Sequence, residues 1–324
     1  PPPTALAATP TSVNSMNVSW TAGGTETAWT VVWGTPGFTP GGSGQIGTQN
    51  FTTNSGTIPG LTANTNYQLY VQADCGSGDV SLWTGPVSTY TGYCTPSSTN
   101  SATFINNFST TNGLGNISNL SSGYTTGGYS DVSATQKVVQ TAGGTFDFNA
   151  AITGGTVGCA IWVDWNNNLT FQTGERVFNT TSYGNGPFTG TITVPAGTAP
   201  GNYRMRVMIH YNSSDPTDPC ATNSRLEVED YTVAVITPLT TPTITQSSAT
   251  PDCTTGTVLS VSGTPGTDQA WYWQTTATGT STANNATTPW TVFQNGTYYV
   301  RSVNTVHNIW STANSITVTN VPVA

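Results

Sequence analysis

Helix-forming charged residues are almost absent from this chain. Its 324 residues include 6 lysines and arginines and 14 aspartates and glutamates, so only 6% are charged. These side chains normally form the exposed face of an amphipathic helix, and Lys, Glu and Arg also have high helix propensity. Glycine and proline are abundant instead, and turn residues separate short apolar runs, which is typical of strands joined by tight loops. The chain is therefore predicted to be all-β.

The charge balance excludes two classes of partner. The formal net charge is −8, and lysine and arginine form no cluster. Binding to nucleic acid requires cationic side chains against the phosphates, so we expect no nucleic acid partner. No apolar run approaches the roughly 20 residues of a membrane-spanning helix, so we expect no membrane insertion. The five cysteines favour an oxidising compartment.

Composition divides the chain into three segments, each long enough for one domain. Residues 1–92 contain regularly spaced strand candidates. Residues 93–237 hold most of the acidic residues and all but one of the basic ones. Residues 238–324 follow a linker rich in threonine and proline. We therefore predict three β-sandwich domains in series.

The segment 1–92 has the spacing of a tyrosine corner, with Leu61 before Tyr67. Together with Trp20 and a closing strand at Ser81–Trp83, this pattern resembles a fibronectin type III domain. The stretch Trp33–Gly41 is similar to versions found in secreted proteins of the Bacteroidota. That resemblance implies export from the cell.

Five short motifs follow one another in the segment 93–237. They are Tyr93–Pro96, Gly128–Asp131, Ile161–Asn166, Tyr203–Val207 and Glu227–Tyr231. In this order they resemble the GEVED domain, a β-sandwich module of bacterial extracellular proteins. The segment departs from the name motif at Leu226, where the family has glycine.

The segment 238–324 resembles an immunoglobulin-like domain. Asn295–Val300 is similar to the turn that enters the F strand, with Val300 where such a domain has its second cysteine. Trp273 is the expected core tryptophan, and Trp310 is expected to begin the closing strand. The resemblance implies an Ig-like sandwich without the inter-sheet disulfide.

The segment Asp164–Glu175 has the ligand order of an EF-hand calcium loop. The expected oxygen donors are Asp164, Asn166, Asn168, Thr170 and Glu175. Leu169 replaces the usual glycine and the flanks are strands, so only weak calcium binding is expected, with a Kd of roughly 0.1–1 mM. The GEVED resemblance brings Asp131 near as a further donor. The alternative is a turn in which these side chains cap their own backbone.

Two pairs of charged residues are predicted to share strand faces. Glu227 and Glu229 lie on one face of the closing strand, and Arg204 and Arg206 lie on one face of another strand. If these faces meet, the charges pair and the pKa of both glutamates falls, which makes them unfit as catalytic acids. An ion-pair lattice that fixes the fold and a ligand-binding role both remain open.

The cysteines allow more than one pairing. We predict a Cys75–Cys94 disulfide at the first domain junction and a Cys159–Cys220 disulfide within the second domain. Cys253 is then the remaining thiol. Pairing of Cys94 with Cys220 is the alternative.

The sequence carries no motif for catalysis. His210 and His307 lie in different predicted domains, and neither His-Glu-x-x-His nor Gly-x-Ser-x-Gly occurs. The presence of ten tryptophans suggests glycan binding as a hypothesis. Four of them are expected in the sandwich cores: Trp20, Trp83, Trp162 and Trp273. Candidates for exposure are Trp29 or Trp33, Trp165, Trp290 and Trp310.

We therefore predict a non-catalytic segment of a secreted or cell-surface modular protein that acts as an adhesin, filament or stalk building block. Its expected partners are other modules of the same protein, surface proteins or glycans, including further copies of itself. One alternative is a set of accessory domains of a secreted hydrolase such as a metalloprotease. Another is a carbohydrate-binding module.

Overall fold

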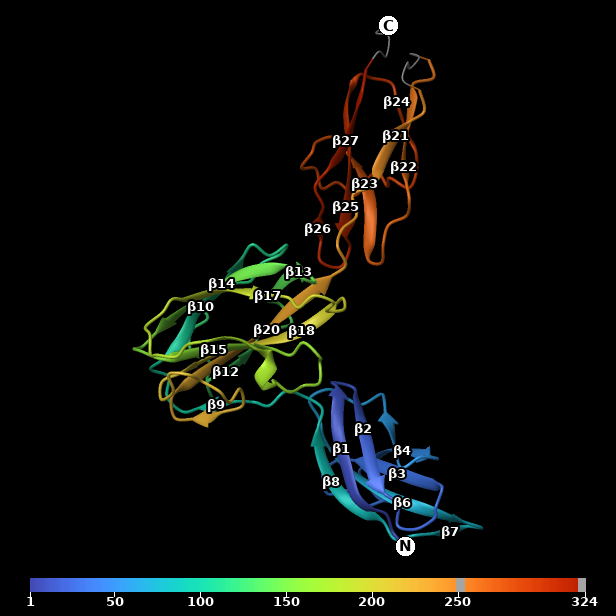
Figure 1. Cartoon of the computed structure of the whole chain (residues 1–324), viewed down its shortest axis with the longest axis vertical. Coiled ribbons are helices and arrows are strands. Elements are labelled where there is room, and N and C mark those ends of the chain that lie inside the picture. Colours follow the sequence, from blue (N-terminus) through green and yellow to red (C-terminus); the bar gives the residue numbers. More distant parts are fainter. Residues whose placement is uncertain (249–253, 320–324) are drawn as a thin grey trace.

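The computed structural model describes residues 1–248 and 254–319. Regular structure in these residues is almost entirely strand, and the one helical element among them is the 3-10 turn η1 (Thr173–Glu175). None of the described residues forms a helix long and apolar enough to cross a membrane. The strands form three two-sheet units in sequence, with the third unit at the opposite end from the N-terminus (Figure 1). The prediction of an all-β chain of serial sandwiches is confirmed.

The first unit packs the sheet β1-β2-β5 against the sheet β4-β3-β6-β7, with β8 also paired to β6. Trp20 and Trp29 meet edge to face in its core, with ring centroids 5.8 Å apart. The Tyr67 hydroxyl accepts a hydrogen bond from the Thr62 backbone N–H at 2.8 Å, which confirms the tyrosine corner. The strands are β1 (Thr4–Ser12), β2 (Ser15–Thr21), β3 (Ala28–Gly34), β4 (Gln45–Phe51), β5 (Ser55–Ile58), β6 (Asn66–Gly76), β7 (Asp79–Val80) and β8 (Thr84–Tyr90).

The closing strand of the first unit begins later than predicted. It starts at Thr84, whereas Leu82 is 79% exposed and Trp83 is half-buried outside the core. Ser81 is the reason, because its hydroxyl accepts the Ala73 backbone N–H where a strand would offer a carbonyl. The ladder is therefore interrupted there, and both the predicted closing strand at Ser81–Trp83 and the predicted core position of Trp83 are wrong.

The middle unit packs the sheet β11-β10-β14-β17 against the sheet β12-β20-β18-β15-β16, and β13 also pairs with β20. Strands β12 and β13 both run parallel to β20, whereas β18 runs antiparallel to it. The strands are β9 (Ser97–Ser98), β10 (Phe104–Thr111), β11 (Ser118–Leu120), β12 (Tyr129–Asp131), β13 (Lys137–Thr141), β14 (Thr145–Thr153), β15 (Gly158–Val163), β16 (Arg176–Asn179), β17 (Phe188–Thr193), β18 (Gly201–His210), β19 (Thr222–Asn223) and β20 (Leu226–Ile236).

The sheet that contains β20 is buried on both faces. One face forms the main core with the other sheet. The opposite face carries Trp162 and Met208, which Tyr93, Leu169 and Phe171 cover. Every residue of β20 is buried as a result. Strands covered on both faces cannot show the alternation of a half-exposed strand, so charged residues on either face need partners inside the protein.

The third unit packs the sheet β21-β22-β24 against a sheet in which β25 pairs with β23, β26 and β27. Trp273 is buried, as the immunoglobulin-like resemblance predicts, and Val300 is buried opposite it. Trp310 belongs to a separate short strand, however, and the closing strand follows it. The strands are β21 (Thr243–Gln246), β22 (Thr257–Ser262), β23 (Gln269–Gln274), β24 (Trp290–Val292), β25 (Gly296–Asn304), β26 (Ile309–Trp310) and β27 (Asn314–Val318).

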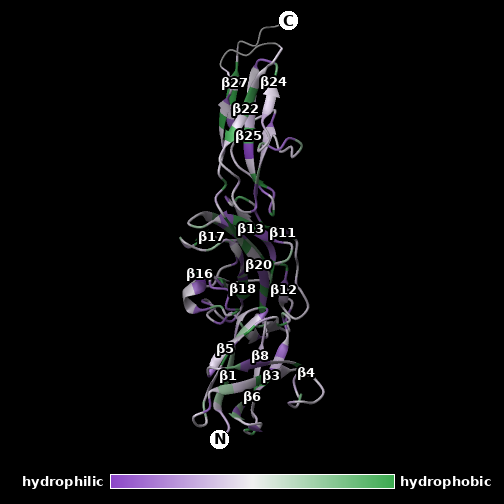
Figure 2. Ribbon diagram, turned by 90° about the vertical axis from the view of Figure 1, so that its right-hand side faces the viewer, coloured by the Kyte–Doolittle hydropathy of each residue, from purple (hydrophilic) through white to green (hydrophobic). Residues whose placement is uncertain are grey.

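The three units follow one another in a row (Figure 2). At the second junction, Ile309 of the third unit packs on an apolar cluster of Val139, Ala234 and Ile236 from the middle unit. At the first junction, the turn after β1 faces the middle unit across a cleft.

Candidate functional site on the middle unit

Asp164 organises the loop that follows β15. Its side chain is fully buried, and its Oδ2 accepts hydrogen bonds from the Tyr93 hydroxyl at 2.7 Å and the Leu169 backbone N–H at 2.9 Å. Its Oδ1 accepts the Asn168 N–H at 3.2 Å. One carboxylate therefore holds the loop closed and ties it to the segment that enters the middle unit.

The other oxygen donors of this loop also accept backbone N–H groups. Asn166 Oδ1 accepts the Asn168 N–H, and Asn168 Oδ1 accepts the Thr170 N–H, both at 3.0 Å. Glu175 is buried, and its two oxygens accept the backbone N–H groups of Trp165 and Gln172. Burial raises the pKa of Glu175, and the nearby Asp164 carboxylate adds to this rise. The self-capping turn is thus present.

Calcium binding by this loop stays a prediction. In the part of the chain that the structure describes, no three His, Cys, Asp or Glu residues gather where they could hold a metal ion. Asp131 does not complete the loop, because it pairs with Arg204 at 2.6 Å. The donors that meet here are two carboxylates and amide oxygens, each already bonded to the backbone.

A melting experiment separates the two hypotheses for the loop. If calcium binds, the middle unit should gain about 2.7 kcal/mol at a calcium concentration 100-fold above Kd. Thermal unfolding of the whole chain in calcium and in chelator measures this gain, and Glu175→Gln should remove it. An equal melting temperature in both buffers would show that the loop is a self-capping turn that does not bind calcium.

Arg206 and Asp230 form a buried bidentate ion pair. Arg206 Nε lies 2.7 Å from Asp230 Oδ1, Nη2 lies 2.8 Å from Oδ2, and both side chains have no exposed surface. Burial lowers the pKa of Arg206, but the Asp230 carboxylate raises it above its ordinary value. The rings of Tyr129 and Phe171 lie against the guanidinium. This pair is a neutral, fully enclosed unit on the outer face of the sheet.

Arg204 lies beside that pair and reaches the surface. Its Nη1 donates to Asp131 at 2.6 Å and to Asp230 at 3.3 Å, and its guanidinium lies 4.9 Å from the centre of the Tyr93 ring. Its side chain is 19% exposed. Burial raises the pKa of Asp131, but hydrogen bonds from Ser133 and Arg204 lower it below its ordinary value.

The predicted pairing of the two arginines with Glu227 and Glu229 is wrong. In the β18–β20 ladder, Arg206 lies opposite Asp230, and residues opposite each other share a face. The two glutamates therefore point to the other face, into the core between the sheets. No salt bridge is found for either glutamate within the described residues.

The two glutamates are held in the core by hydrogen bonds instead of ion pairs. Glu227 Oε2 accepts the Ile105 N–H at 2.8 Å, whereas its Oε1 is buried without a hydrogen-bond partner. Glu229 accepts hydrogen bonds from the Tyr231 hydroxyl and the Asn119 amide. Burial, and next the charge of Glu229, raise the pKa of Glu227 to about 9, and burial also raises that of Glu229. The predicted fall in pKa is wrong because no arginine reaches this face.

The disulfide joins Cys94 to Cys220, with Cα atoms 5.6 Å apart. This confirms the alternative pairing, and the predicted Cys75–Cys94 and Cys159–Cys220 bonds are wrong. Cys159 is free and buried, because it points from β15 into the core, and burial raises its pKa. Cys75 is exposed and bonds no other cysteine among the described residues. Cys253 lies outside the described residues.

Few of these tryptophan rings have a face that is free to stack against a ligand. Trp20, Trp162 and Trp273 are buried as predicted, and Trp29 is buried as well. Three others are half-buried and lie against tyrosine rings: Trp165 against Tyr203, Trp290 against Tyr298 and Trp310 against Tyr272.

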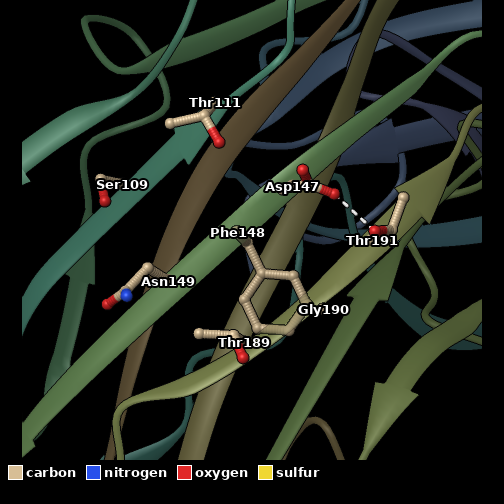
Figure 3. A pocket seen from close by; sticks show the side chains of 8 residues that line it. All are labelled: Ser109, Thr111, Asp147, Phe148, Asn149, Thr189, Gly190 and Thr191. Carbon is tan, nitrogen blue, oxygen red and sulfur yellow. Dashed lines mark hydrogen bonds between the residues drawn. The ribbon is translucent and has the colours of Figure 1, made fainter.

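A polar trough of about 550 Å³ on the outer face of the other sheet was not predicted (Figure 3). Asp147 lies in it and accepts hydrogen bonds from Thr191 and Asn112, which lower its pKa. Polar residues at every second position of β10, β14 and β17 were the signal that could have found it. They form two rows across the sheet: Ser109, Asn149 and Thr189, then Thr111, Asp147 and Thr191.

Two family models match parts of the chain. The fibronectin type III domain matches residues 1–90, and the GEVED domain matches residues 158–234. Both are typically non-catalytic modules, and together with the disulfide they fit a modular extracellular protein. An origin in the Bacteroidota stays a prediction.

Several solved structures match parts of the chain or nearly all of it. The FN5 domain of Drosophila Lar is 18% identical, over 27% of this chain and 91% of that chain, with a TM-score of 0.22. The fn3 domain of human collagen alpha-1(XX) is 26% identical, over 28% and 81%, also with 0.22. The FN1-FN3 domains of chicken CNTN1 are 12% identical, over 98% of both chains, with 0.27. Among curated proteins, none matches the chain significantly.

Proposed function

We propose that the chain is a force-transmitting spacer in an extracellular adhesin or stalk. The observation that carries this proposal is the position of the Cys94–Cys220 disulfide. Cys94 lies where the chain enters the middle unit, and Cys220 lies shortly before β20, the strand that leads to the third unit. A pull between the outer units therefore runs through the two sulfur atoms and bypasses the residues between them.

The surroundings of the disulfide support this role. Arg206 Nη1 donates to the Pro219 carbonyl at 2.9 Å and lies 3.2 Å from Cys94 Sγ. Because Arg206 is fixed by Asp230, both ends of the crosslink are attached to the centre of the buried sheet. Tension that enters at Cys94 thus crosses the disulfide toward β20, while the contacts of Arg206 hold both cysteines against the buried sheet.

Single-molecule stretching tests the proposal. With the disulfide intact, unfolding of the middle unit should not release the loop between the two cysteines, which are 126 positions apart. Reduction should add roughly 420–450 Å of contour length, at about 3.3–3.6 Å per residue. The measurement uses handles at the two ends of the whole chain, with and without a reducing agent.

Matched variants identify the bond that is responsible. The double variant Cys94→Ser/Cys220→Ser should give the long extension without reductant, and Cys75→Ser should behave as the unaltered chain does. If the unaltered chain gives the same extension before and after reduction, the disulfide does not transmit the load and the proposal fails.

A further inference from the structure

A cleft of about 300 Å³ lies where the first unit meets the middle unit. One wall carries Val13, from the turn after β1, and the other carries Tyr93, Leu169 and Tyr203. Clefts of this size at domain junctions, with apolar walls and a few polar groups, are typical of small-molecule sites. None of the predicted site residues pointed to a cleft shared by two units, because Val13 and Tyr203 are far apart in the sequence.

Two polar side chains in this cleft have hydrogen-bonding groups that bond none of the described residues. Asn202 is exposed, and its side-chain amide has no protein partner among the described residues. Within the described part of the chain, Arg204 bonds Asp131 and Asp230 through Nη1 alone, which leaves its Nε and Nη2 donors free. Stacking on Tyr93 holds the guanidinium in place. The cleft thus offers fixed donors and an amide beside aromatic rings.

The charges around the cleft decide which class of ligand fits. Arg204 is the one cationic side chain that lines it, and its charge is already paired with Asp131 at 2.6 Å. An anionic ligand would therefore gain little net attraction from Arg204, because the Asp131 carboxylate already pairs with its guanidinium. A neutral molecule with both apolar and hydroxyl surfaces suits the site, because its hydroxyls can bond Asn202 and Arg204 while its apolar face packs on Val13, which is 41% exposed.

We infer that this junction cleft binds a neutral sugar unit of a glycan. Pyranose rings combine C–H faces, which pack on aromatic and aliphatic side chains, with hydroxyls that pair with amide and guanidinium groups. The site would give the spacer an adhesive function of its own. It does not depend on force transmission, because sugar binding and stretching are measured separately and either can fail alone.

A glycan array probed with the whole chain tests the inference. The array carries neutral oligosaccharides that end in hexoses or N-acetylhexosamines, and sialylated or sulfated counterparts. We expect binding to neutral members, and titration of the best one should show at least tenfold weaker binding for Asn202→Ala and for Val13→Asp. Both residues are on the surface, so these variants should keep the melting temperature of the unaltered chain.

Matched controls lie elsewhere on the surface. Asn149→Ala removes an exposed amide from the polar trough, and Val80→Asp adds a charge at a residue of the first unit that is 58% exposed. Both should bind as the unaltered chain does. A blank array, binding confined to acidic glycans, or an equal loss in the cleft and control variants would overturn the inference.

Discussion

Replacing Arg206 with methionine should destabilise the middle unit by about 3–5 kcal/mol. The methionine keeps the apolar stem, but it removes both hydrogen bonds to Asp230, whose side chain has no exposed surface. The carboxylate would keep only the Tyr129 hydroxyl at 2.9 Å and the longer contact with Arg204. A buried charge without its partner is far more unfavourable than the loss of an exposed ion pair.

Hydrogen exchange of the β20 amides in the whole chain measures this effect, because that strand lies in the centre of the middle unit. Arg204→Met is the matched control. Its side chain is partly exposed and Asp230 keeps Arg206, so we expect a loss of about 1 kcal/mol or less.

A double variant tests whether the unpaired charge of Asp230 causes the loss of stability. Arg206→Met/Asp230→Leu removes both charges, so most of the lost stability should return. If the double variant is as unstable as Arg206→Met, the unpaired charge is not the cause. Equal exchange rates in Arg206→Met and Arg204→Met would contradict the burial argument itself.

The strands and their alternation could be read from the sequence with good accuracy. The tyrosine corner at Tyr67 follows from local spacing, the core position of Trp273 follows from the immunoglobulin-like resemblance, and both are found. The closing strand of the first unit was placed too early because a serine hydroxyl can replace a backbone group in the ladder. Nothing in the residue types of positions 81–83 shows that replacement.

The partners of the charged residues could not be predicted in the same way. The period of two correctly places Glu227 and Glu229 on one face, but it does not show that both faces of β20 are buried. The register with β18 decides the partners, and it sets Arg206 against Asp230. Register depends on contacts between distant segments, so spacing within one strand cannot supply it.

The disulfide pairing could not be predicted from the sequence for the same reason. Cys159 and Cys220 lie in the same predicted domain, but β15 turns Cys159 into the core while Cys220 lies in a loop on the opposite face. Counting the cysteines gives the number of possible disulfide pairings, and only the fold selects among them.

The buried glutamate pair leads to the second large effect. Glu227 has no charged partner, one of its oxygens has no hydrogen bond, and its pKa is raised to about 9 by burial first and then by Glu229. In the unfolded chain the same carboxyl group titrates at about 4.3. From about pH 5 to pH 9 the folded state therefore holds a proton that the unfolded state has released.

Stability should consequently fall as the pH rises through this window, by up to about 1.4 kcal/mol per pH unit for one proton. Below the unfolded pKa both states are protonated and the penalty is absent. Glutamine at position 227 cannot ionise, so Glu227→Gln should stabilise the middle unit, and its advantage should grow from pH 5 to pH 9. Some slope should remain in the variant, since burial also raises the pKa of Glu229.

Urea unfolding of the two chains at pH 5, 7 and 9, followed by exchange of the β20 amides, gives the difference between them. Burial lowers the pKa of His210 and His307, but these groups titrate alike in both chains and cancel in the difference. Glu26→Gln, in the first unit, is the matched control and should leave β20 unchanged. A gain that is constant across the pH range would show that Glu227 does not hold a proton in the core. A gain that shrinks toward pH 9 would also contradict the prediction, because a lowered folded pKa would change the difference only below the unfolded value of about 4.3.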